Sequence, residues 1–222
     1  MSNSKINFAA VMILVHLSIT RGLDVTIERS AAFVQAGIPD AATRDGFATY
    51  VRTLGWVINA HHMSEDNIIF PFFRSKLPDA PFDELSANHL VISEILKEIQ
   101  MTVEPIATQA QPVDALNVLN RSVTRLKELW HPHIAKEQLY IYDPDKIDAV
   151  MKEDEQIKLL TQVSEHSLKQ ADPGFLLPFI LYNLPTEGRA YMAKTMPPAV
   201  VQEMLPGPWQ EKWKPMKPFF LD

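Results

Sequence analysis

Four long stretches with helix-forming composition, separated by short turn signals, limit the folds open to this chain. The first covers about residues 5–36 and ends at Gly37-Ile38-Pro39, a pattern typical of a helix C-terminus. The others run from about Asp40 to the Phe70-Pro71 region, from about Asp83 to Thr108, and from about Pro112 to Tyr142. No segment alternates like a strand between hairpin turns. These features predict an all-α fold, an antiparallel up-down four-helix bundle.

The character of the chain changes after Asp143-Pro144-Asp145. A fifth helix is expected over about residues 146–170, followed by a stretch rich in proline and aromatic residues. This stretch contains FLLPFILYNL and is too apolar for a disordered tail, because disorder goes with low hydrophobicity. We therefore expect a bundle over residues 1–143, and a C-terminal helical and irregular extension over residues 144–222 that packs on it.

The composition excludes several classes of function. The formal net charge is −6 and the charges are scattered, whereas a nucleic-acid partner requires a basic face. The chain has no cysteine, so disulfides, thiolate zinc sites, iron–sulfur clusters and cysteine nucleophiles are all excluded. Any metal site must be built from His, Asp and Glu. No phosphate-binding loop or separate nucleophile is evident, so the sequence leaves open whether the chain is an enzyme.

The apolar stretch Phe8–Ile19 has two interpretations. It resembles the core of a signal peptide, but it is too short to span a membrane, and Thr20-Arg21-Gly22 is a poor cleavage site. The apolar pattern also continues at helical spacing through Leu23, Ile27 and Phe33. We favour a buried first helix, and hence a cytoplasmic protein that does not bind a membrane.

Two His-Glu pairs share one spacing. His61 precedes Glu65 by four residues, and His133 precedes Glu137 by four. Four residues of α-helix correspond to about 400° of rotation and about 6 Å of rise, so each pair lies on one helix face. His62 lies three residues before Glu65, so that carboxylate is expected between the two neighbouring histidines.

Depth in the bundle links these pairs to two further histidines. His16 lies 23 residues before Pro39, and His61 lies 22 residues after it. His89 lies 22 residues before the turn at about residue 111, and His133 lies 22 residues after it. Residues equally far from a turn lie at the same level of an antiparallel hairpin. A lone helical histidine is more often a surface residue, but such a buried layer would be destabilising without a cation, so the pattern predicts a metal site.

At these residues the chain resembles the hemerythrin-like, or HHE cation-binding, family, as a long member with a proline-rich C-terminal extension. The matching segments are His16, HHMSEDNIIFP (61–71), NHLVISEIL (88–96) and HPHIAKEQLYIY (131–142). The resemblance implies two iron ions with an oxo or hydroxo bridge, iron being favoured over manganese or zinc. It also implies that Glu65 and Glu137 bridge the ions and that the terminal ligands are His16, His61, His89 and His133.

Two departures from the family pattern concern the ligands. Invertebrate oxygen carriers have a second histidine four residues further along helix three, where this chain has Ser93. They bridge with an Asp five residues after the helix-four histidine, whereas Glu137 comes four residues after His133. One iron would therefore lack a nitrogen ligand, which His62, Asp66 or water could supply. His62 could equally be a surface histidine, and reversible oxygen carriage is disfavoured.

Residues near these motifs have weaker signals. Pro132 is expected to bend helix four, and His131 to be exposed or to lie outside the ligand set. The nearby aromatic residues Trp56 and Phe70 are expected to pack in the core. Tyr140, seven residues after His133 and thus on a similar face, is the aromatic residue expected beside the site.

The favoured function is that of a non-haem diiron protein that binds or reacts with O₂, peroxide or NO. One alternative is iron sensing or storage. Another is an interaction module in which the metal stabilises the fold and the extension binds a protein partner or a second copy of the chain. An exposed apolar surface at about residues 175–184 would support this last alternative.

Overall fold

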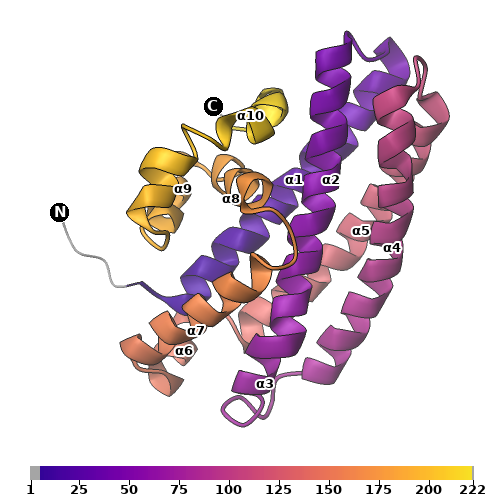
Figure 1. Cartoon of the computed structure of the whole chain (residues 1–222). Coiled ribbons are helices and arrows are strands. Elements are labelled where there is room, and N and C mark those ends of the chain that lie inside the picture. The colour runs from indigo at the N-terminus through magenta and orange to yellow at the C-terminus, as the bar shows by residue number, and fades with distance from the viewer. Residues whose placement is uncertain (1–5, 222) are drawn as a thin grey trace.

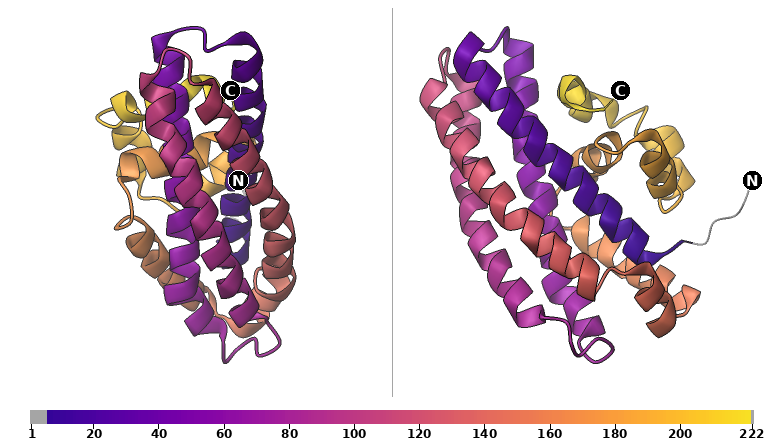
Figure 2. Two further views of the ribbon diagram at one scale, coloured as in Figure 1. Left: turned by 90° about the vertical axis from the view of Figure 1, so that its right-hand side faces the viewer. Right: turned by 180° about the vertical axis from the view of Figure 1, so that it is seen from behind.

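The computed structural model describes residues 6–221, and its four long helices lie side by side (Figure 1; Figure 2). They are α1 (Phe8–Ala36), α2 (Ala41–Ser64), α4 (Phe82–Thr108) and α5 (Val113–Tyr140). Short connections make neighbours antiparallel; α1 and α4 both pack on α5, and α4 also packs on α2. Within the described residues all regular structure is helical, which confirms the predicted all-α bundle.

Capping side chains define where the first two helices begin. The Asn7 side chain accepts a hydrogen bond from the Ala10 N–H at 3.0 Å, and Asp40 accepts one from the Thr43 N–H at 2.7 Å. Gly37 ends α1 with φ at 78°, a conformation that a side chain would strain. Local sequence signals therefore determine the bounds of this hairpin.

The second predicted helix contains a feature that the periodicity does not reveal. After Ser64 the chain continues through one turn of π-helix, η1 (Glu65–Ile69), into the short α3 (Phe70–Phe73). In this turn the Phe70 N–H donates to the carbonyl of Glu65, five residues back. The π turn holds one extra residue, so Glu65, Ile69 and Phe70 are all buried.

The extension is helical almost throughout. It comprises α6 (Pro144–Val150), α7 (Glu153–Ser167), α8 (Pro173–Tyr182), α9 (Thr186–Ala193), a π turn η2 (Val200–Met204), α10 (Gln210–Trp213) and a 3-10 helix η3 (Lys214–Phe219).

The single helix expected over residues 146–170 is wrong, because the chain breaks between α6 and α7. Met151 has an extended backbone, with φ −138° and ψ 135°, and its side chain is buried with Ile147 and Leu159. The Glu155 carboxylate then accepts a hydrogen bond from the Lys152 N–H at 3.0 Å, which starts α7. Burial of apolar side chains from both helices therefore outweighs the uninterrupted helical pattern.

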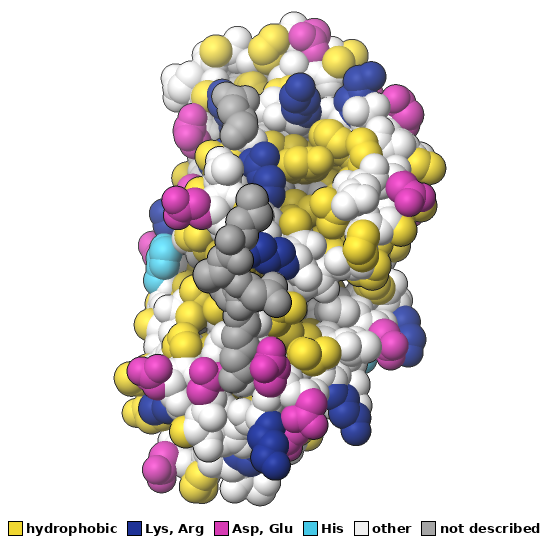
Figure 3. Space-filling model, turned by 90° about the vertical axis from the view of Figure 1, so that its left-hand side faces the viewer, with side chains coloured by type: hydrophobic (Ala, Val, Ile, Leu, Met, Phe, Trp, Pro, Cys, Tyr) yellow, Lys and Arg dark blue, Asp and Glu magenta, His cyan; other side chains and the backbone are white. Residues whose placement is uncertain are grey.

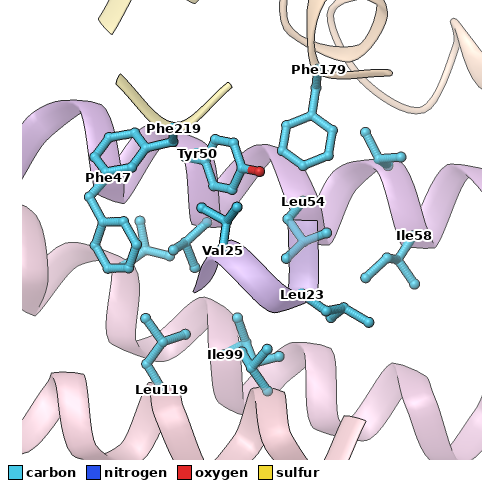
Figure 4. Packing of buried hydrophobic residues seen from close by; sticks show 14 of the residues in the cluster. Leu23, Val25, Phe47, Tyr50, Leu54, Ile58, Ile99, Leu119, Phe179 and Phe219 are labelled. Atoms are coloured by element: carbon cyan, nitrogen blue, oxygen red, sulfur yellow. The ribbon is translucent and has the colours of Figure 1, made fainter. Parts of the chain in front are cut away.

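The extension contributes to the same core as the bundle. Charged side chains of both signs are scattered over the face in Figure 3, while Figure 4 shows extension residues packed inside. The Tyr50 ring on α2 lies 4.9 Å from the ring of Phe179 on α8 and 5.6 Å from that of Phe219 on η3. The Tyr50 hydroxyl also donates to Asn183 Oδ1 at 2.7 Å. Helices of the bundle thus pack against apolar residues of the extension as well as against one another.

Two glycines of the bundle allow this close approach. A methyl group at Gly22 on α1 would lie 2.8 Å from Leu54 Cδ1 and 2.9 Å from Phe179 Cζ. One at Gly46 on α2 would overlap the carbonyl oxygen of Pro215. The extension therefore contacts α1 and α2 at positions that have no room for a side chain.

The apolar α1 is a wall of this core. By length and composition it is the one helix of residues 6–221 that could cross a membrane, yet 56% of its most apolar window is buried inside the molecule. The segment 173–184 is likewise packed inwards, with every residue buried or half-buried. The exposed apolar surface expected of a partner-binding extension does not occur there.

Candidate metal centre

One buried layer of the bundle contains all seven predicted site residues. Each is at most 5% exposed, although all of them are ionisable. They come from five elements: His16 (α1), His61 and His62 (α2), Glu65 (η1), His89 (α4), His133 and Glu137 (α5).

The predicted depth matching is confirmed by two close imidazole pairs. His16 Nε2 lies 3.1 Å from His61 Nε2, and His89 Nε2 lies 3.1 Å from His133 Nε2. Two imidazole nitrogens bound to one ion at about 2.1 Å and about 90° apart would be about 3.0 Å from each other. Both pairs therefore have the spacing of two ligands of a single ion.

Potential ligand atoms form two overlapping clusters. We call His16, His61, Glu65 and Glu137 site A, and His62, Glu65, His89 and His133 site B. In each site one ligand atom per residue lies within 4.8 Å of all the others. Site A offers two nitrogens and two carboxylates, and site B offers three nitrogens and one carboxylate.

The two glutamates reach both clusters. Glu137 Oε2 lies 3.3 Å from His16 Nε2, while its Oε1 lies 3.0 Å from His133 Nε2. Glu65 Oε2 lies 3.5 Å from His61 Nε2 and 3.4 Å from His89 Nε2. Each carboxylate is therefore positioned between the two sites.

Several atoms of this layer are buried without a hydrogen bond to any described residue. They are Glu65 Oε2, both carboxylate oxygens of Glu137, His62 Nε2 and His133 Nδ1. Leaving such a group unsatisfied costs about 1–3 kcal/mol, and more for a charged one. Bound cations would satisfy the three carboxylate oxygens and His62 Nε2, so the donor set fits a metal centre.

Burial keeps three of the histidines neutral. It lowers the pKa of His16 to about 4, against the opposing effect of the Glu137 charge. Burial likewise lowers the pKa values of His61 and His62 well below their ordinary value, and neighbouring imidazoles add to the effect. Neutral imidazole is the form that binds a metal, so these rings need not lose a proton first.

The pKa values of Glu65, Glu137 and His89 depend on one another as well as on burial. Burial raises the pKa of Glu65 well above its usual range, and the nearby Glu137 adds to the rise. Burial acts on Glu137 in the same direction, but the imidazoles of His133 and His89 outweigh it and hold its pKa well below that range. Burial lowers the pKa of His89, yet Asp66 and Glu137 raise it to about 10. Without metal, Glu65 and His89 therefore hold protons. A metal ion bound to their ligand atoms should displace these protons into solution.

Asp66 supports His89 rather than joining either cluster. Its Oδ2 lies 2.9 Å from His89 Nδ1, and the Ser86 hydroxyl donates to its Oδ1 at 2.6 Å. A carboxylate on one ring nitrogen orients the imidazole and directs the other nitrogen, here Nε2, toward the site. The sequence offered His62, Asp66 or water as the ligand in place of the absent helix-three histidine. Asp66 contacts His89 and not the clusters themselves.

His62 is buried, so the surface interpretation of this residue is wrong. Its ring stacks on that of His89 with centroids 4.0 Å apart and planes inclined by 12°. Its nitrogen is one of the potential ligand atoms of site B. His131, by contrast, is exposed, and α5 continues through Pro132.

The tyrosine at the site is Tyr142, not Tyr140. Tyr140 is exposed, whereas the buried Tyr142 hydroxyl donates to Glu65 Oε1 at 2.6 Å. The N–H groups of Ile141 and Tyr142 both donate to the carbonyl of Glu137, at 2.7 and 2.8 Å, which ends α5 and turns Tyr142 inwards. Helical periodicity misses this residue because it lies two positions beyond the end of α5 at Tyr140. Burial raises the pKa of Tyr142 well above its usual value, so it stays a donor.

Trp130 is a second residue that the motifs do not indicate. Its buried ring lies 5.6 Å from the ring of His16 and 6.0 Å from that of His61, and its Nε1–H donates to Thr20 Oγ1 at 2.8 Å. The sequence does contain a signal for this residue. Trp130 lies three residues before His133, and so on the same face of α5.

Phe70 is also beside the site, although it was expected only in the core. Its ring lies 5.6 Å from that of His89, with planes inclined by 20°. Trp56 instead packs on Phe175 of α8 at 5.8 Å. Together with Trp130 and Tyr142, Phe70 gives the layer an apolar wall.

Comparison with known proteins adds one finding. The family model described as Hemerythrin HHE cation binding domain matches residues 10–143, more than half of the chain, and this range contains all seven site residues. Neither the curated proteins nor the solved structures contain a match. The family match and the buried His/Glu clusters together indicate a metal-binding domain.

Proposed function

Because the chain belongs to the hemerythrin HHE cation-binding domain family, we propose that its buried layer binds two iron ions and, through them, binds or reacts with O₂, peroxide or NO. The observation that carries this proposal is the position of two carboxylates between two nitrogen clusters. A single-ion site would not need ligands arranged around two centres. The mixed nitrogen and oxygen donors suit iron, with manganese and zinc as less favoured occupants.

Each ligand has a role in this proposal. Glu65 and Glu137 would each hold both ions through their carboxylates. His16 and His61 complete site A, while His62, His89 and His133 complete site B. When bound, paired ferrous ions would supply the electrons that reduce O₂ or peroxide.

Residues outside the ligand set control the surroundings. Tyr142 holds Glu65 Oε1, so that Oε2 is directed to the imidazoles. Asp66 fixes the ring of His89. Trp130 and Phe70 exclude water from one layer of the core, which favours binding of a small diatomic molecule over hydrolysis or proton leakage.

Metal content and an absorption spectrum of the aerobically purified protein test the proposal. We expect two irons per chain and a charge-transfer band from an oxygen bridge to iron. Glu65→Ala should lose both ions, while Glu94→Ala, an exposed glutamate on α4, should keep both. Zinc in the purified protein, or no metal after anaerobic reconstitution with ferrous iron, would contradict the diiron proposal. Loss of one ion in Glu65→Ala would contradict the bridging role.

Exposure of the ferrous protein to O₂, peroxide and NO separates reactivity from iron handling. A spectral change with each oxidant, or a stable NO complex, is the expected result. If iron binds and raises the melting temperature but none of these ligands changes the spectrum, the alternative of iron sensing or storage is favoured. A cytoplasmic location without a membrane or nucleic-acid partner is also our proposal, supported by the packing of α1 into the bundle.

A further inference from the structure

The bundle and the extension enclose a cavity beside the metal centre. It has a volume of about 450 Å³ and is lined by residues of α1, α2, α7, α8 and α9. This lies within the range of about 300–1,000 Å³ that small-molecule sites occupy. On the side of the molecule that carries α7 and α9, hydrophobic side chains gather in a hollowed part of the surface (Figure 3). The extension therefore builds a ligand-sized space that the four helices alone would not have.

The lining is aliphatic. It includes valines, leucines, isoleucines and three methionines, and none of its described residues is Phe, Tyr or Trp. Flat aromatic ligands are usually held by stacking or edge contacts with aromatic rings, which this lining lacks. Methionine and leucine side chains adapt their rotamers to a flexible apolar ligand. Representative lining residues are Val11, Met12, Val57, Leu160, Ile180 and Met192.

Polar side chains line both the inner end of the cavity and its mouth, but the inner hydroxyl groups have partners within the protein. At the inner end the Ser64 hydroxyl is occupied, since it donates to the Ala60 carbonyl at 2.8 Å and lies 2.9 Å from Ser167 Oγ. The exposed polar lining residues Thr161, Ser164, Glu165 and Lys194 mark the mouth, together with the exposed apolar Ile157 and Leu168. A ligand that is apolar throughout its length and polar at one end matches this distribution.

We propose that this cavity binds a single unbranched aliphatic chain, with its methyl end toward Ser64 and a small polar head at the mouth. Fatty acids and fatty alcohols share this chemistry. This binding site is additional to the metal centre and does not require a bound metal. No covalent change of the chain is involved.

One wall residue connects the cavity to the metal centre. His61 lines the cavity, while its Nε2 lies 3.1 Å from His16 Nε2 in site A. A bound chain would therefore contact a ring that belongs to the candidate ligand set. Occupancy of the cavity should be detectable at this imidazole in the metal-free protein.

Fluorescence titration of the full chain with cis-parinaric acid, a linear polyene fatty acid, tests the proposal. We expect saturable binding of one molecule per chain, displaced by dodecanoate and by 1-dodecanol but not by the aromatic 8-anilinonaphthalene-1-sulfonate. Met196→Trp, which places a large ring in the cavity, and Thr161→Trp, which places one at its mouth, should each weaken binding at least tenfold. Gln162→Trp adds the same ring to an exposed position of α7 outside the lining and should bind as the unchanged protein does.

Lys194→Ala distinguishes the head groups. If the carboxylate contacts Lys194, this change should weaken dodecanoate about two- to fivefold and leave 1-dodecanol unchanged, whereas Lys169→Ala should affect neither. If the dodecanoate affinity is unchanged, the head group lies near Thr161 rather than Lys194. The cavity would still be a binding site for the aliphatic chain.

Three results would overturn the proposal. They are the absence of saturable binding, equal binding in both tryptophan variants of the lining, and displacement of the probe by the aromatic competitor at least as well as by dodecanoate. In the metal-free protein, the ring C–H signal of His61, assigned with His61→Asn, should shift as dodecanoate is added. An unshifted His61 signal at saturation would also count against this position of the chain.

Discussion

At the scale of single residues, Glu65 has the position on which both clusters depend. Its Oε1 accepts the Tyr142 hydroxyl, while its Oε2 lies between His61 and His89. One oxygen is thus fixed and the other is directed into the layer. This division of roles makes Tyr142 a positioning residue for the carboxylate, and it makes the neighbouring histidines sensitive to the orientation of Glu65.

Tyr142→Phe removes the hydroxyl without changing the size of the ring. Because partners of a ligand typically contribute 10- to 100-fold to metal affinity, we expect iron binding to weaken by about that factor. Competition with a chelator of known affinity measures the change. Tyr140→Phe is the matched control, since Tyr140 is exposed and should leave affinity unchanged. Equal affinity in both variants would exclude a positioning role for Tyr142.

His62→Ala tests the nitrogen that the sequence left open. If His62 completes site B, the variant should retain about one iron per chain, held in site A by His16 and His61. Metal analysis after gel filtration measures the content. His131→Ala, an exposed histidine on α5, should retain two. Two irons in His62→Ala would show that water or another residue supplies the ligand.

At the scale of elements, α2 connects the metal centre to the extension. Its C-terminal end supplies His61 and His62 and leads into the π turn at Glu65. Its N-terminal half packs on η3, where Gly46 lies against Pro215. The same substitution at different positions of α2 should therefore raise or lower the free energy of unfolding, depending on what packs against that position.

Two glycines of α2 make a matched pair. Gly46→Ala would overlap the Pro215 carbonyl, a rigid backbone group, and overpacking of this kind costs about 1–3 kcal/mol. Gly55→Ala has only Gln100 Oε1 near it, at 4.0 Å, and should stabilise the protein by up to about 1 kcal/mol through helix propensity. Urea unfolding of both variants measures the free energies. Equal stability would mean that η3 does not contact α2 closely.

At the scale of the whole molecule, the bundle and the extension share one apolar core. Leu176, Phe179, Met216 and Phe219 of the extension belong to the same buried cluster as residues of all four long helices. Each fully buried side chain of this size contributes about 1.5–3 kcal/mol. Four of them amount to a large part of the total of about 5–15 kcal/mol by which a domain is stable.

Deletion of residues 144–222 should therefore prevent cooperative folding. We expect the shortened chain to retain helix by circular dichroism but to unfold over a broad temperature range, whereas the full chain unfolds in one sharp transition. Calorimetry measures both. A shortened chain with a sharp transition and two bound irons would show that the extension is dispensable for the bundle.

Metal removal should lower the stability of the whole molecule. A ligand present at about 1,000 times its Kd stabilises the folded state by about 4 kcal/mol, which for a chain of this size raises Tm by about 8–16 °C. Melting curves with and without a chelator measure the shift. In the double variant Glu65→Ala with Glu137→Ala, the chelator should not change Tm. A Tm independent of iron in the unchanged protein would contradict a buried metal centre.

The sequence alone was sufficient for the four long helices of the bundle and for the level of the site. Caps such as Asp40, the Gly37 turn and helical periodicity act within a few residues, so they can be read from the chain. The depth matching of His16 with His61 also follows from sequence, because antiparallel helices of equal rise keep equal distances from a turn. The family resemblance supplied the roles of the ligands.

Only the tertiary structure decided which further side chains enter the site. Tyr142 follows the end of α5, and periodicity no longer predicts direction once a helix ends. The burial of His62, the break at Met151 and the π turn at Glu65 depend on apolar neighbours that are distant in the chain. The aliphatic cavity likewise exists only where α7, α8 and α9 meet α1 and α2, because packing between distant segments, unlike local propensity, has no period in the sequence.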